Sequence, residues 1–126
     1  MVDVKVNRAY TAIVVTFRDA VDAQQTEELY NNLQQIIPKL ERGFKILTDL
    51  SFLESMDTEA HLSIEKLMKL CNQYGVSKII RVIPDSSKDI GFNIMSLFHY
   101  SHDVHVVTYQ STEEALKHIF LGDSIQ

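Results

Sequence analysis

The side chains best placed to form a functional site lie between an apolar strand pattern and an apolar helix pattern. Asp57 is a good helix N-cap, and Thr58 and Glu59 then fall in the first turn of the predicted helix. Backbone N–H groups and the helix dipole both stabilise negative charge at such a position. The pattern therefore predicts a functional site that favours an anion.

A buried strand and an amphipathic helix are predicted to hold this site. The strand runs from Phe44 to Leu50, where apolar residues are too closely spaced for one solvated face. A polar turn over Ser51–Asp57 follows, and the helix continues to about Tyr74, with Gly75 as its C′ residue. One stripe of the helix is apolar and predicted to face inward: Ala60, Ile64, Leu67, Met68 and Cys71.

Two short runs at these elements resemble a known family. Asp49-Leu50-Ser51 is followed, five residues later, by the run from Met56 to Ala60, MDTEA. This resembles the signature of STAS domains, the fold of anti-sigma-factor antagonists, in which Asp-Leu-Ser leads at the same spacing into Ile-Asp-Ser-Ser-Gly. The C-terminal run VVTYQSTEEAL, from Val106 to Leu116, also resembles the last strand and the Ser-x-Glu-Glu-Ala-Leu helix of that family.

The resemblance implies a regulatory role for the start of the helix. In sporulation-type antagonists the second serine of the signature is phosphorylated, and Glu59 stands at that position here. Thr58 stands at the position directly after the aspartate, which some stressosome-type relatives modify. Ala60 replaces the glycine of the signature, and Phe52 stands where many members have glycine. By resemblance, a protein partner such as an anti-sigma kinase would bind at Asp57, Ala60 and His61.

Both regulatory positions keep an ordinary alternative. Glu59 is either a fixed charge in place of a switchable phosphate, or a common first-turn residue stabilised by the helix dipole by ~0.3–1 kcal/mol. Because a carboxylate carries one charge and a phosphoserine about −1.5 to −2, the mimicry is partial. Thr58 is either a phosphorylation site or a first-turn residue without a regulatory role.

Composition restricts the class of protein. The chain has 126 residues, enough for one domain with a real core, and a single domain over residues 1–126 is predicted. The net charge of −5 argues against a nucleic-acid surface, and no apolar run approaches a membrane span. The single cysteine, Cys71, cannot form an internal disulfide, which fits a cytoplasmic protein.

The remaining elements follow from periodicity and capping signals. Alternating valines predict a strand over residues 2–6, and a second strand follows from Tyr10 to Phe17. A capping box of Asp22 and Gln25 opens a helix that Pro38 should end or kink. Later segments comprise a strand at 78–83, a short helix at 89–98, a strand at 104–109 and a helix from Ser111 to about Leu121. The order β-β-α-β-α-β-α-β-α predicts an α/β fold, STAS-like, with helices packed against a mixed sheet.

The short helix at residues 89–98 has apolar side chains on nearly every face. Phe92, Met95 and Phe98 form either an exposed hydrophobic patch or a part of the core. An exposed patch would suit a module that has lost the phospho-switch and binds a small hydrophobic or lipid-like ligand, or forms a homodimer.

No constellation in the sequence predicts an enzyme. Asp49 and Asp57 are explained by a strand end and a helix cap, and no nucleophile with an evident base accompanies them. Three histidines, His99, His102 and His105, are interpreted as polar residues of a helix end, a loop and a strand start. We therefore predict a non-enzymatic binding protein without catalytic residues, cofactor or metal.

Overall fold

The computed structural model describes residues 1–82 and 105–121, which form an α/β arrangement around a five-stranded mixed sheet. The strand order is β1-β2-β3-β4-β5. β1 and β2 are antiparallel, whereas β2 to β5 run parallel to their neighbours. The elements are β1 (Val2–Asn7), β2 (Ala12–Val21), α1 (Ala23–Ile36), η1 (Ile37–Lys39), β3 (Lys45–Met56), α2 (Ala60–Gln73), β4 (Lys78–Val82), β5 (His105–Tyr109) and α4 (Thr112–Leu121).

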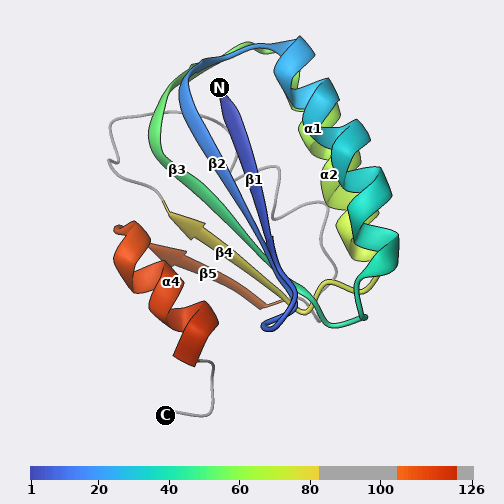
Figure 1. Ribbon diagram of the computed structural model, residues 1–126. Coiled ribbons are helices and arrows are strands. Elements are labelled where there is room, and N and C mark those ends of the chain that lie inside the picture. Colours follow the sequence, from blue (N-terminus) through green and yellow to red (C-terminus); the bar gives the residue numbers. More distant parts are fainter. Residues whose placement is uncertain (83–104, 122–126) are drawn as a thin grey trace.

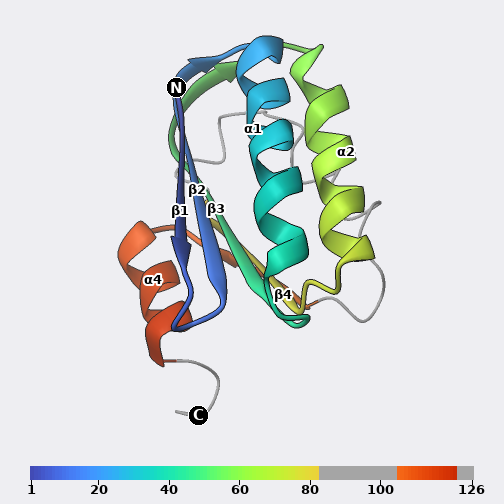
Figure 2. The ribbon, with the colours of Figure 1, turned by 45° about the vertical axis from the view of Figure 1, so that its right-hand side comes forward.

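Helices cover the two faces of the sheet unequally. α1 and α2 lie side by side on one face, and α4 packs on the other (Figures 1 and 2). The larger core lies beneath α1 and α2, where Phe17, Leu33 and Ile64 are buried. The smaller core joins Ala115 and Ile119 of α4 to Ala12, Leu47 and Ile80 of the central strands. β3 is therefore covered on both faces, as its continuous apolar run predicts.

The segment after Leu50 has a different structure from the one that the sequence predicts. Residues 51–56 continue β3 instead of forming a polar turn, because the second strand also runs past Phe17 and pairs with them. This pairing is irregular, with register shifts near Arg18 and a positive φ of 56° at Asp19. Leu53 points into the core and is fully buried, while Phe52 is half exposed. The alternation of exposed and buried side chains that is typical of a strand was therefore present at Phe52 and Leu53, although the polar residues around them resemble a turn.

The start of α2 is also displaced from the prediction. The helix begins at Ala60, and Glu59 holds the N-cap position without a side-chain capping bond. The prediction of Asp57 as N-cap is therefore wrong, because Asp57 lies two residues before the N-cap position. Thr58 and Glu59 lie in the turn that precedes the helix, not in its first turn.

The other helix boundaries agree with the local signals. The Asp22–Gln25 capping box forms in both directions. α1 ends at Ile36, and the Pro38 segment is a short 3₁₀ turn, as expected of a proline that cannot continue the helix. Gly75 has a φ of +81° after α2, the left-handed conformation of a C′ glycine. The predicted helix at 89–98, with Phe92, Met95 and Phe98, lies outside the described residues.

Candidate functional site

The turn between β3 and α2 presents three polar side chains to solvent. Asp57, Thr58 and Glu59 are all exposed, whereas the Ala60 side chain is fully buried. The Asp57 N–H donates to the Val21 carbonyl at 3.0 Å, which ties the turn to the end of β2. The turn therefore displays a hydroxyl and two carboxylates on a fixed backbone, with Ala60 acting as its internal anchor.

A groove between α1 and α2 begins at this turn. Its volume is about 430 Å³, and Glu59, Leu62 and Lys66 line it from the α2 side. From α1 it receives Glu27 and Tyr30, together with other residues of the same face. His61, which the sequence placed beside the turn, is half-buried and does not line the groove. The groove therefore combines apolar surface with two acidic side chains and one basic side chain.

Leu62 is the residue of this surface that sequence interpretation missed. Its side chain is 65% exposed, although it is a large apolar residue in an ordered helix. A signal was available, because Leu62 lies off the inward stripe that contains Ala60 and Ile64. An apolar side chain on the solvent face of an amphipathic helix has no role in the core. Leu62 lies one helical turn beyond Glu59 and adds an apolar contact point to the charged turn.

Asp49 serves a different purpose from the exposed acids. Its carboxylate is 2% exposed and accepts from the Ser51 N–H at 3.0 Å and from the Ser51 hydroxyl. Its second oxygen accepts from the Thr112 hydroxyl at 2.8 Å. These bonds connect the middle of β3 to the first residue of α4. The two aspartates of the signature-like runs thus lie in different environments, since Asp49 is buried in this network and Asp57 is exposed in the turn.

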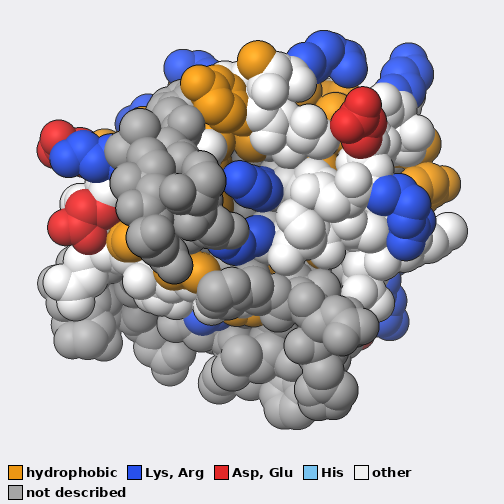
Figure 3. Space-filling view, turned by 90° about the horizontal axis from the view of Figure 1, so that it is seen from below, with side chains coloured by type: hydrophobic (Ala, Val, Ile, Leu, Met, Phe, Trp, Pro, Cys, Tyr) orange, Lys and Arg blue, Asp and Glu red, His pale blue; other side chains and the backbone are white. Residues whose placement is uncertain are grey.

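Charge is distributed unevenly between the two ends of the sheet. At the end where β2 and β3 finish, Asp19, Asp22, Glu54, Asp57 and Glu59 are exposed. At the opposite end, Lys and Arg side chains predominate among the charged groups in view (Figure 3). The turns and strand starts at that end of the sheet contain Arg8, Lys39, Arg42 and Lys45. The candidate site therefore lies on an acidic end, which would attract a basic partner surface.

A second cavity lies on the sheet face that carries α4. It has a volume of about 520 Å³ and is lined by Val14, Leu116 and Ile119 together with the polar Asp49 and Arg18. The Arg18 guanidinium lies 4.7 Å from the centre of the Phe52 ring at the same cavity. Its size and mixed lining are in the range of small-molecule sites.

Within residues 1–82 and 105–121, no group of three or more His, Cys, Asp or Glu residues is arranged to hold a metal ion. His99 and His102 lie outside this part of the chain. Among the described helices, none combines the length and the apolar character that crossing a membrane requires.

Three solved structures of other proteins share this fold. A SpoIIAA-like protein from the uncharacterised DUF3478 family of Shewanella loihica PV-4 aligns with a TM-score of 0.68 at 9% identity, covering 94% of this chain and 92% of that one. The anti-sigma factor antagonist SpoIIAA in its unphosphorylated form aligns with a TM-score of 0.66 at 14% identity, covering 94% and 97%. A candidate anti-sigma factor antagonist from Thermotoga maritima aligns with a TM-score of 0.60 at 17% identity, covering 94% of each chain.

These likenesses confirm the STAS-like, SpoIIAA-like fold that the element order predicts. No family model matches the sequence, and no curated protein matches it. At such low identity the fold is shared while the function must be argued from the site.

Proposed function

We propose that this chain is a cytoplasmic, non-enzymatic regulatory module that binds a protein partner at the turn Asp57–Glu59 and the adjoining groove between α1 and α2. The observation that carries the proposal is the exposed Leu62 beside Glu59, on the fold of anti-sigma factor antagonists. Leu62 and Tyr30 supply apolar contact, and Glu27 supplies the charge that attracts a basic side chain of the partner. The partner that fits has an apolar pocket bordered by basic side chains, as a regulatory kinase-like protein can offer.

Leu62→Asp is expected to weaken partner binding at least about tenfold, because it places a charge in the apolar centre of the contact. The fold should be unaffected, since a substitution at a 65% exposed position changes stability by no more than about 0.5 kcal/mol. The measurement is affinity capture from the native host, followed by titration of the captured protein against both variants. Tyr10→Asp is the matched control: Tyr10 is also an exposed large hydrophobic residue, but it lies at the opposite end of the sheet. If both variants lost the same amount of affinity for the partner, the α1–α2 groove would not be the binding site.

We assign to Glu59 the role of a fixed negative charge that meets no basic side chain of the partner and therefore opposes docking, as phosphorylation does in sporulation-type antagonists. Glu59→Ser is then expected to raise the affinity for the captured partner about tenfold, equivalent to about 1.4 kcal/mol, because an unpaired carboxylate no longer loses its solvation in the interface. Glu41→Ser, an exposed acid at the other end of the molecule, is the control and should change nothing. Isothermal titration compares the three proteins. An unchanged constant for Glu59→Ser would leave Glu59 as an ordinary residue before a helix.

A second candidate is supported by the 520 Å³ cavity beside α4, which favours a small-molecule binding module. Its apolar side is formed by Val14, Leu116 and Ile119, and Asp49 and Arg18 offer polar groups that could orient a ligand. The two candidates use different faces of the sheet, because the cavity shares no residue with the α1–α2 groove. A ligand that binds in this cavity should raise the melting temperature of the protein. If Leu62→Asp still weakened partner binding in the presence of that ligand, one chain would have both binding activities.

A further inference from the structure

β1 is an edge strand whose outer side is unpaired within the described part of the chain. The hydrogen bonds at its start show which residues face outward. Met1 and Arg18 exchange two backbone bonds, at 2.9 and 2.8 Å, so they form a hydrogen-bonded pair with β2. Because such pairs alternate along an antiparallel ladder, Asp3 and Lys5 bond inward as well. The N–H and C=O groups of Val2, Val4 and Val6 therefore point to the free edge.

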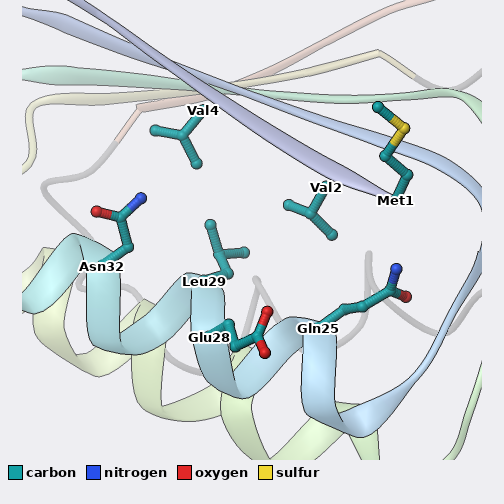
Figure 4. A pocket seen from close by; sticks show the side chains of 7 residues that line it. All are labelled: Met1, Val2, Val4, Gln25, Glu28, Leu29 and Asn32. Atoms are coloured by element: carbon teal, nitrogen blue, oxygen red, sulfur yellow. The ribbon is translucent and has the colours of Figure 1, made fainter.

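A groove runs beside this edge, between β1 and α1. Its volume is about 360 Å³, and Figure 4 shows Val2 and Val4 projecting from the strand toward Leu29 and Asn32 of the helix. Val2 and Val4 are only partly buried, although they pack against the main core. The edge thus offers a row of unpaired backbone groups next to an incompletely covered apolar surface. These are the two features that an added strand uses.

We propose that the occupant is a second copy of this chain, which adds its own β1 antiparallel about a two-fold axis at Val4. In this register Val4 is opposite Val4 of the second copy, and Val2 is opposite Val6. All three outward-facing residues are then hydrogen-bonded, and the valine row on the α1 side continues across both sheets. On the other face, Asp3 of each copy is opposite Lys5 of the other copy, in the closer, non-hydrogen-bonded pairs.

The neighbouring registers are disfavoured by the same two charges. A shift of the second copy by two residues in one direction places Asp3 opposite Asp3, and a shift in the other direction places Lys5 opposite Lys5. Like charges directly opposite each other destabilise a strand pair, so the central register is selected. A one-residue shift would turn the valines to the wrong face. The run VDVKV is therefore complementary to itself in one antiparallel register.

A charged residue on an edge strand can also serve only to prevent aggregation, so the experiment must separate the two roles. Lys5→Glu leaves only acidic groups at positions 3 and 5, and Asp3→Lys leaves only basic ones. Each variant alone is expected to dissociate at least about tenfold more readily than the unmodified protein, because both cross-strand pairs become repulsive. An equimolar mixture of the two should form a heterodimer in which every pair is attractive. The double variant D3K/K5E should restore the homodimer.

Sedimentation equilibrium over a range of protein concentrations measures all four cases, with thermal unfolding to confirm that each variant is folded. The Asp3–Arg18 ion pair, at 3.4 Å and about 40% exposed, contributes little, so its loss should not unfold Asp3→Lys. A mixture that behaves as the average of its two components would overturn the proposal, as would an unmodified protein that remains monomeric at millimolar concentration.

Cross-linking tests the position of the axis. Cα atoms in a hydrogen-bonded antiparallel pair are about 5.5 Å apart, which suits a disulfide. Val4→Cys should therefore form a covalent dimer under mild oxidation, much faster than Ala9→Cys in the exposed β1–β2 turn. The native Cys71 is buried and does not compete. Equal rates for both variants would show that Val4 is not on a two-fold axis. The α1–α2 groove shares no residue with this edge, so failure of the dimer leaves the proposed partner site untouched.

Discussion

Replacement of Leu53 by alanine is expected to lower the free energy of unfolding by about 2–5 kcal/mol, because it deletes a side chain that is fully buried in the main core and leaves a cavity. The size of the effect tests whether residues 51–56 form a strand. If they formed an exposed polar turn, the same change would cost no more than about 0.5 kcal/mol.

The neighbouring residue supplies the control. Phe52 is larger than Leu53 but 50% exposed, and its contact is the Arg18 guanidinium at 4.7 Å. Phe52→Ala should therefore cost only about 0.5–1 kcal/mol, the value of an exposed cation–π contact. Chemical denaturation of both variants measures the difference. A larger loss at Phe52 than at Leu53 would reverse the assignment of the two faces of β3.

Asp49→Ala is expected to destabilise the protein by about 2–4 kcal/mol, since the carboxylate accepts bonds from Ser51 and Thr112 in a site that is 2% exposed. The loss should be felt at α4, because Thr112 is its first residue. Hydrogen exchange at residues 112–115 should accelerate more than exchange in the middle of α1.

Thr112→Val separates the bond to α4 from the rest of the network. It removes one donor and keeps the shape of the side chain, so it should cost about 1–2 kcal/mol and accelerate the same amides. If Asp49→Ala lowered stability while exchange in α4 stayed unchanged, the carboxylate would act within β3 alone through Ser51.

The candidate site was predictable in its location but not in its geometry. The run from Asp49 to Ala60 pointed to the junction of β3 and α2, and the structure places Thr58 and Glu59 there, exposed. The prediction of the N-cap relied on the side chain of Asp57, which is suitable for capping. It was wrong because the path of the backbone depends on the hydrogen bond between Asp57 and Val21 of β2. Propensity identifies a residue that can cap a helix, and only tertiary pairing decides whether it does.

By itself the sequence determined the order of the elements within residues 1–82 and 105–121, the helix ends at Pro38 and Gly75, and the apolar stripe of α2. Each of these depends on local stereochemistry or on a regular period. Tertiary structure decided the length of β3, since strand pairing is a contact between distant residues. It also decided that Asp49 connects β3 to α4 and that the β1 edge lies open beside a groove. These features arise where separate elements meet, and no spacing within one element encodes them.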